Sequence, residues 1–344
     1  MSEIRSRVLE LKSKLGVAIA AHYYQRDEIV EIADFMGDSL ELSRRAASDP
    51  KEFLIFCGVG FMAQSVKIIA PFKRVLMPKI ACCSMAKMID GEMFDRAIGS
   101  LMAQGVAKDD ILPIAYINSN ADVKARVGKM GGSICTSANA ERILRWALEQ
   151  GGAASEKRIF FAPDRCLGLN LAAKMGLSAA VLRSGLDLGD LANARMICFD
   201  GFCSVHQLFT PRDVDFYREK YAGILIAAHP ECDPAVVAKA DFVGSTSQII
   251  KFARELPSKQ KIAVGTEFNL VNRLREAGKG KENTFVLSAT KPECPTMNET
   301  RLSDLLAVLE SIDRGEFINE IFVDENDVKF ARVALDRMLD ISGK

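Results

Sequence analysis

The sequence predicts an α/β protein made of three similar lobes, each with a short parallel sheet. Short apolar runs alternate with amphipathic helical stretches along most of the chain, which is typical of β/α units. The 344 residues exceed the usual size of a single hydrophobic core. The apolar runs also fall into three sets that follow one plan, so we expect three compact units instead of one.

Each set repeats the same order of elements. A strand runs into a polar or aromatic turn, a second strand feeds a helix start rich in small residues, and the last strand is followed by a cysteine. The sets span residues 16–86, 111–206 and 223–298. From them we predict three lobes and a C-terminal pair of helices that packs back on the lobes, over residues 1–105, 106–210, 211–300 and 301–344.

Charge and the N-terminal residues exclude several classes of partner. Lysine and arginine together number 45, as do aspartate and glutamate, so the chain has no net charge to attract nucleic acid or an anionic membrane. The apolar run 15–21 is too short for a signal peptide or a membrane span. We expect a cytoplasmic protein that acts on small molecules. In that reducing compartment its nine cysteines are not expected to form disulfides.

Three cysteines occupy equivalent places, one in each predicted lobe. Cys83, Cys203 and Cys294 follow the last strand of their sets, where ligands gather in α/β units. Three converging thiolates suit an iron–sulfur cluster with one open iron or a zinc ion with one open position. The residues alone do not decide between Cys82 and Cys83. Other cysteines lie in or at the edge of apolar runs, and we interpret these as core residues: Cys57, Cys135 and Cys198.

Polar residues follow the first strand of each set in pairs two positions apart. Because side chains alternate along an extended chain, the two members of a pair face the same way. The pairs are His22 with Tyr24, Tyr116 with Asn118, and His229 with Glu231. Each pair alone could be a satisfied turn, but together they favour a site at the strand ends, where His229 and Glu231 could move protons. The remaining histidine, His206, lies three residues after Cys203.

Helix starts rich in small and hydroxyl residues provide candidate anion-binding sites. Backbone N–H groups at such starts bind carboxylates and phosphates. Ser137, Ser245 and Thr246 lie at these junctions, although capping the helix is the commoner role for serine and threonine there. The glycine-rich motifs of dinucleotide-binding and P-loop proteins are absent from the sequence, so neither a nicotinamide cofactor nor a nucleoside triphosphate is indicated.

The order of motifs between His22 and Met297 resembles that of the quinolinate synthases. The motifs are, in sequence order, HxY, DSLELS, GVxFMA, CxSMA, YxNS, TSAN, GxCxVH, HPEC, GST, GTE and CxxM. This resemblance implies three αβα three-layer lobes in a pseudo-threefold arrangement around a central active site. It further implies condensation of iminoaspartate with dihydroxyacetone phosphate to quinolinate, with loss of phosphate and water, in NAD biosynthesis.

The resemblance also implies the residues of the site. Its motifs assign a [4Fe–4S] cluster to Cys83, Cys203 and Cys294, which decides against Cys82, and the open iron would act as a Lewis acid. Proton transfer and enolisation are assigned to Tyr24, Tyr116, Asn118 and Glu231, with His206 beside the cluster ligand. Substrate binding is assigned to His22, Ser39, Ser137, His229, Ser245, Thr246 and Thr266.

Two other functions fit the residues taken alone. A zinc enzyme of the aldolase type could use the same three thiolates to polarise a ketose phosphate. A cluster-bearing redox sensor or scaffold would need no catalytic groups, which the histidine, tyrosine and hydroxyl groups at the strand ends argue against. Because iminoaspartate is unstable, the synthase interpretation also predicts a functional link to an aspartate-oxidising enzyme.

Overall fold

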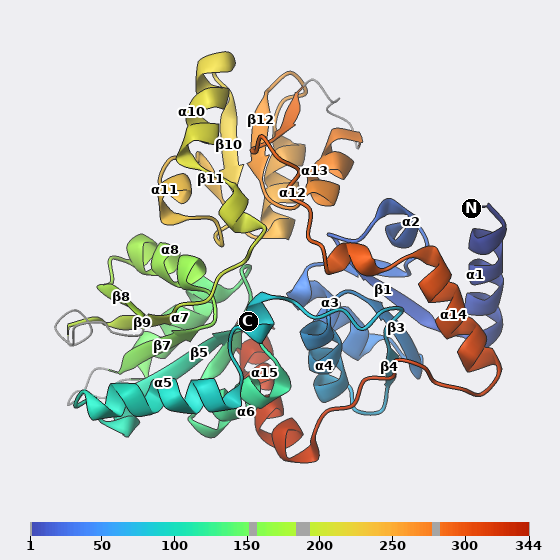
Figure 1. Ribbon diagram of the computed structural model, residues 1–344, viewed down its shortest axis with the longest axis horizontal. Coiled ribbons are helices and arrows are strands. Elements are labelled where there is room, and N and C mark those ends of the chain that lie inside the picture. Colours follow the sequence, from blue (N-terminus) through green and yellow to red (C-terminus); the bar gives the residue numbers. More distant parts are fainter. Residues whose placement is uncertain (1, 151–156, 184–192, 277–282, 344) are drawn as a thin grey trace.

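The strands of the protein form three separate parallel sheets, one in each successive part of the chain. The computed structural model describes residues 2–150, 157–183, 193–276 and 283–343. In Figure 1 the elements gather into three groups that surround the middle of the molecule, and helices cover the sheets. The predicted fold class is therefore confirmed as three αβα lobes with small, all-parallel sheets.

The three sheets share one strand order. In each, the first strand of the lobe lies between the second and the third. The first sheet runs β2 (Phe35–Gly37), β1 (Ala18–His22), β3 (Phe53–Cys57), β4 (Arg74–Leu76). The third sheet runs β11 (Phe242–Val243), β10 (Leu225–Ala228), β12 (Ile262–Gly265), β13 (Thr284–Val286). The second adds an edge strand and runs β6 (Ser133–Cys135), β5 (Ile111–Tyr116), β7 (Arg158–Ala162), β9 (Met196–Phe199), β8 (Ala179–Leu182).

Helices connect the strands and cover the sheets. Those near the first sheet are α1 (Ser2–Leu15), α2 (Asp27–Val30), α3 (Ser39–Ser48), α4 (Gly60–Ile69) and the 3₁₀ turn η1 (Met85–Lys87). Those near the second are α5 (Gly91–Ala103), η2 (Lys108–Asp110), α6 (Ala121–Lys129), α7 (Ala140–Glu149), α8 (Arg165–Met175) and η3 (His206–Leu208), which follows its strand β9. The third part has α10 (Pro211–Lys220), α11 (Pro234–Val237), α12 (Thr246–Glu255), α13 (Phe268–Leu274) and η5 (Met297–Glu299).

The central strands are apolar along their whole length because both faces of each sheet are covered. All residues of β1 and β5 are buried, as are four of the five in β3 and in β7. Parallel strands covered on both faces lose the alternation of polar and apolar residues seen in half-exposed sheets. Within the described residues, no helix combines the length and the apolar character that a membrane span needs.

The last two helices pack back on the first two lobes. α14 (Leu302–Asp313) packs against α1, and α15 (Glu325–Gly343) packs against α6 (Figure 1). Between them the chain follows the edge of the first sheet, where the Ile321 N–H donates to the Val75 carbonyl at 2.8 Å. The predicted lobe boundaries stay predictions. α5 precedes the predicted boundary at residue 105, yet it packs against elements of the second lobe. It contacts α6, and its Phe94 ring contacts Phe160 of β7.

The shared strand order determines where a site can form. With this strand order the chain leaves the first strand toward the second and leaves the third strand in the opposite direction. Ligands bind at the carboxyl ends of parallel strands where the order reverses in this way. The first strands of the three sheets end at His22, at Tyr116 and one residue before His229. The first strand of each lobe therefore leads to a polar side chain at its carboxyl end.

Gly128 provides a test of the packing of α15. A Cβ atom at this position of α6 would lie 2.0 Å from the Phe330 carbonyl oxygen, so Gly128→Ala must push the two helices apart. We expect the free energy of unfolding to fall by about 1–3 kcal/mol. Gly99→Ala in α5, where a Cβ would meet no atom within 4 Å, should instead be stabilising by about 0.5–1 kcal/mol. Urea unfolding followed by circular dichroism measures both, and equal effects would contradict the close contact.

Candidate functional site

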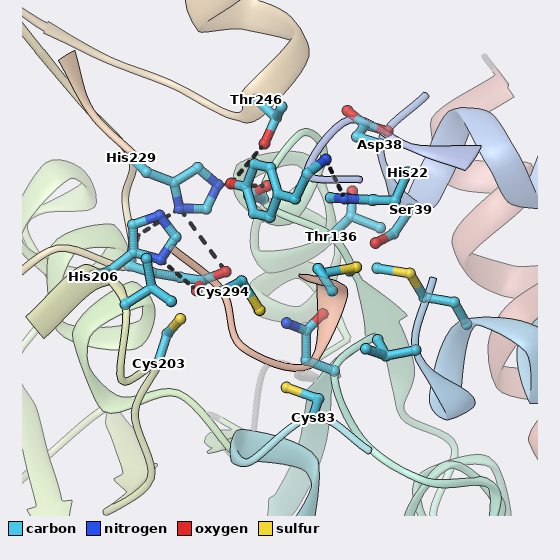
Figure 2. A pocket seen from close by; sticks show the side chains of 18 of the residues that line it. His22, Asp38, Ser39, Cys83, Thr136, Cys203, His206, His229, Thr246 and Cys294 are labelled. Carbon is cyan, nitrogen blue, oxygen red and sulfur yellow. Dashed lines mark hydrogen bonds and ion pairs between the residues drawn. The ribbon is translucent and has the colours of Figure 1, made fainter. Parts of the chain in front are cut away.

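A pocket lies where the three lobes meet. Its atom-free space is about 640 Å³, including the part open to solvent. Most of the residues predicted for the site line it: His22, Tyr24, Ser39, Cys83, Tyr116, Asn118, Ser137, Cys203, His206, His229, Glu231, Thr246 and Cys294. Figure 2 shows residues from all three lobes around this space.

The three cysteines of the pocket are held by the same backbone turn. Cys83, Cys203 and Cys294 come shortly before the one-turn helices η1, η3 and η5. In each turn, the N–H of the residue four positions further along donates to the cysteine carbonyl, at 3.2, 3.2 and 3.1 Å. One local structure therefore brings a thiol to the pocket from each lobe (Figure 2).

The environment of these thiols is suited to a bound cation. Burial raises the pKa of all three, to about 12 for Cys83. The charges of Glu231, Cys83 and Cys294 raise the pKa of Cys203 further. The backbone N–H three positions after each cysteine acts in the opposite direction and lowers its pKa. Each turn thus offers its sulfur a stabilising donor, and a cation bound among the thiolates would relieve their mutual repulsion.

The six other cysteines are not among the described residues that line the pocket. Cys82 is exposed, so the two neighbouring cysteines differ in surroundings, as alternation along the chain leads one to expect. Cys57, Cys135 and Cys198 are buried among apolar residues, which confirms their interpretation as core. Each of the nine cysteines, all within the described residues, is a free thiol.

A buried network surrounds the Glu231 carboxylate. Tyr116 donates its hydroxyl to Oε1, and His206 Nδ1 lies 3.0 Å from Oε2. The other ring nitrogen of His206 contacts the Thr266 hydroxyl at 3.2 Å, and Tyr24 contacts the same hydroxyl at 2.9 Å. Both oxygens of the carboxylate and both nitrogens of the imidazole therefore have partners.

Electrostatics keeps the Glu231 side chain ionised. Burial acts to raise its pKa, but the histidines His206 and His229 and hydrogen bonds from His206 and Tyr116 together lower it to about 2. Burial and the charge of Glu231 raise the pKa of Tyr24 and Tyr116 well above its ordinary value, so both phenols stay protonated. A carboxylate and two phenol protons thus lie beside the pocket.

His22 and His229 repeat one arrangement in the first and third lobes. In each, Nδ1 accepts the backbone N–H of the residue two positions on, at 3.1 Å and 3.3 Å, which leaves Nε2 as the N–H donor of the neutral ring. His229 Nε2 lies 3.3 Å from the Ser137 hydroxyl. Burial lowers the pKa of each histidine to about 3. Both rings are therefore neutral donors near pH 7.

Helix starts from the first and third lobes bring hydroxyl groups to the pocket. Ser39 and Thr246 are the first residues of α3 and α12, whose preceding residues Asp38 and Ser245 form capping boxes. Ser245 thus has the capping role that is common for serine. The two helix starts are joined, because Ser247 donates to the Asp38 carboxylate at 2.7 Å.

Ser245 and Thr266 differ in position from the other predicted residues. Ser245 contacts Ser247 at 3.2 Å, and Thr266, fully buried, contacts Tyr24 and His206. Both lie behind residues that line the pocket.

The structure adds residues that sequence reasoning missed. Thr136 and Asp38 line the pocket beside predicted serines, and the motifs TSAN and DSLELS already contained them. The apolar wall comes largely from the GVGFMA motif and consists of Val59, Phe61, Met62, Val205 and Met297. The buried Asp164, with one carboxylate oxygen unpartnered, lies close enough to Glu231 for burial and that charge to raise its pKa well above its usual range.

Two buried side chains hold the backbone on both sides of a pocket residue. The Lys124 ammonium of α6 donates to the carbonyls of Ile117 and Ser119, which flank Asn118. Asn118 Oδ1 itself is buried without a hydrogen-bond partner in the described structure, although Asn118 lines the pocket. In the same way, the Asn170 amide of α8 donates to the carbonyls of the residues before and after Glu231. Asn170 lies far from its acceptors in the sequence, whereas Lys124 is five and seven residues from its own. We find no sequence signal that would have revealed either contact.

Comparison with known proteins identifies the family. The family model described as "Quinolinate synthetase A protein" matches residues 6–340. The chain is 49% identical to quinolinate synthase of Helicobacter pylori over 99% of both chains. This chain belongs to the quinolinate synthase family. It is also 43% identical to the Streptomyces coelicolor enzyme and 41% identical to that of a Geobacillus species, over 98% and 99% of this chain and 88% and 94% of theirs.

Two sets of residues in this quinolinate synthase homologue could hold a metal. One is the trio of cysteine turns. The other is Cys203, His206 and Glu231, whose ligand atoms all lie within 4.8 Å of one another. The second set would have to give up hydrogen bonds to Tyr116 and Thr266, because both ends of His206 and of the carboxylate are engaged. The thiols of the first set can bind a soft metal and keep their backbone N–H contacts.

The buried histidines predict a loss of stability in acid. Their pKa of about 3 lies below the usual 6.5, so the unfolded chain takes up protons first as the pH falls. The stability is present in full above pH 6.5 and is lost between 6.5 and about 3, at about 1.4 kcal/mol per pH unit for each histidine. Urea unfolding between about pH 7 and pH 5 measures how the free energy of unfolding changes with pH. His22→Gln should lower this slope by the contribution of one histidine, about 1.4 kcal/mol per pH unit. An unchanged slope would mean that His22 titrates normally.

Proposed function

We propose that the protein condenses iminoaspartate with dihydroxyacetone phosphate to form quinolinate, with loss of phosphate and water. The observation that carries this proposal is the trio of equivalent cysteine turns in a pocket that also holds helix starts and a proton-transfer network. Membership in the quinolinate synthase family supports it. We place the reaction in the cytoplasm, as a step of NAD biosynthesis, with an aspartate-oxidising enzyme as the source of the unstable iminoaspartate.

A [4Fe–4S] cluster fits the donor set of the pocket. Cys83, Cys203 and Cys294 offer three sulfurs, each with a stabilising backbone N–H, and soft thiolates favour iron–sulfur clusters. Three ligands for four irons leave one iron open, and when bound the cluster would supply a Lewis acid at that iron without electron transfer. The residues around it would bind the substrates and transfer protons.

The pocket binds anions without cationic side chains. The two substrates together carry two carboxylates and one phosphate, yet the described residues that line the pocket include neither lysine nor arginine. Positive potential comes from the starts of α3 and α12, with Ser39 and Thr246 at their first positions. His22 and His229 add neutral N–H donors, and Ser137 adds a hydroxyl. We assign the carboxylates and the phosphate to these groups.

Proton transfer falls to the network around Glu231. Condensation and enolisation need a group that takes a proton from carbon and a group that returns one to oxygen. The ionised Glu231 can accept a proton, and Tyr116, hydrogen-bonded to it, can donate one. His206 orients the carboxylate from the other side. Tyr24, and Asn118 with its unpartnered oxygen, would orient the substrate across from this pair.

The zinc aldolase stays the alternative because three thiolates also bind zinc. Cys203, His206 and Glu231 are close enough to hold such an ion. The network of partners on His206 and Glu231 favours their use as proton-transfer groups instead. Metal content separates the two functions.

The cluster is tested by metal analysis of protein purified without oxygen. We expect a brown protein with about four irons and four sulfides per chain, whose absorbance falls on reduction with dithionite. Cys83→Ser, Cys203→Ser and Cys294→Ser should each lose the cluster. Cys82→Ser, at the exposed neighbour of Cys83, is the matched control and should keep it. A colourless protein with about one zinc would move the aldolase to first place.

The acid–base role is tested by Glu231→Gln. The amide keeps the shape of the side chain but cannot accept a proton, so turnover of iminoaspartate and dihydroxyacetone phosphate should fall about 10²- to 10⁴-fold with the cluster retained. Glu255→Gln, at an exposed carboxylate near the end of α12, should leave turnover unchanged. Quinolinate formed per minute is the measurement. Full turnover of Glu231→Gln would remove this residue from the mechanism.

A further inference from the structure

The backbone on both sides of Glu231 is held by a side chain from another lobe. Asn170 lies in α8 of the second lobe and is 8% exposed. Its amide nitrogen donates to the Pro230 and Cys232 carbonyls, both at 2.9 Å. A primary amide has two N–H groups, so these two bonds use its whole donor capacity. The two acceptors are the residues immediately before and after Glu231.

This contact matters because Glu231 works across a boundary between lobes. Its backbone belongs to the turn between β10 and α11, in the third lobe. Its side-chain partners Tyr116 and His206 come from β5 and from η3, which follows β9 of the second sheet. A small shift of this turn relative to the second lobe would separate the carboxylate from both partners. Asn170 joins the turn to the second lobe from behind, where α11 packs against α8.

We propose that Asn170 is a positioning residue that sets the place of the Glu231 carboxylate against Tyr116 and His206. This inference rests on the proposed role of Glu231 in the reaction. Asn170 is not among the residues of the described chain that line the pocket, so it acts through Glu231 and has no contact with substrate. Lys124 holds the carbonyls on both sides of Asn118 in the same manner, but within one lobe.

Replacement of Asn170 should reduce turnover more than binding. Asn170→Leu is of similar size and removes both donors, so the turn is free to shift by a fraction of an ångström. Misplacement of a catalytic group by about 1 Å costs up to about 10²-fold in rate, and we expect kcat to fall about tenfold or more. KM should change less than kcat. Among the proposed anion-binding groups only His229 belongs to the turn that Asn170 holds, and the starts of α3 and α12 are untouched. Asn170→Ser, which keeps one donor, should show a smaller loss.

A matched control lies in the same lobe as the turn. The side-chain amide nitrogen of Gln260 also donates to two backbone carbonyls, those of Gly223 at 2.8 Å and Lys261 at 3.0 Å. Gln260→Leu removes the same number of hydrogen bonds at the outer end of the third sheet. Its kcat should equal that of the unmodified enzyme. Iron content, measured in every variant, should be unchanged.

A double-mutant cycle separates positioning from a general structural role. In the Glu231→Gln variant, the side chain that Asn170 positions can no longer act as a base. Adding Asn170→Leu to this variant should therefore lower kcat by much less than it does in the unmodified enzyme. An equal loss in both backgrounds would overturn the proposal. So would unchanged kcat in the Leu and Ser variants. If the Leu variant does not fold, the same cycle is made with Asn170→Ser.

Failure of the proposed function gives a different result. If the unmodified protein forms no quinolinate, the reaction itself is wrong. The hold of Asn170 on the turn around Glu231 is then measured by hydrogen exchange in the cluster-containing protein. Asn170→Leu should speed the exchange of amides in residues 229–233 and leave those of β5 unchanged, whereas Gln260→Leu should affect neither. Unchanged exchange in residues 229–233 would mean that Asn170 does not hold the turn.

Discussion

The arrangement of the pocket depends on one buried carboxylate, that of Glu231. A carboxylate without water around it is unstable unless other groups replace the hydration that it has lost. Here Tyr116 and His206 supply that replacement from the second lobe, while the charged group itself comes from the third. The requirement to satisfy this charge therefore fixes how two lobes approach each other. The same contacts bring a carboxylate, a phenol and an imidazole together in the pocket.

The three lobes contribute in equivalent ways because they share a strand order and a turn. Their first strands end at the carboxyl edge of each sheet, where the strand order reverses, and their last strands lead to a cysteine before a single 3₁₀ turn. The sulfur in each turn is stabilised by a backbone N–H at the same offset. Backbone geometry, which depends little on side-chain identity, is thus what repeats. This explains why the lobes resemble one another in pattern more than in sequence.

The sequence revealed the fold and most of the pocket because the signals were local. Spacing of two along a strand predicted that His22 and Tyr24, or His229 and Glu231, would face the same way, and the motif order identified Cys83 over Cys82. The side chains that position them were not predictable. Asn170 looks like an ordinary helix residue, and only the packing of α8 against α11 gives it acceptors. Lys124 has its acceptors in the turn just before α6, but its letter in the sequence looks like that of any helix lysine. Asp164 was likewise missed, since its neighbour Glu231 is far away in the chain.

The difference in exposure between two adjacent cysteines has a practical consequence for spectroscopy. Cys82 is exposed, whereas Cys83 is partly covered within the pocket and five other cysteines are buried. A maleimide reagent used in mild excess should therefore react first at Cys82. A fluorophore or spin label attached there would sit one residue from a wall of the pocket. Its signal would then report the arrival of small molecules without alteration of any pocket-lining side chain.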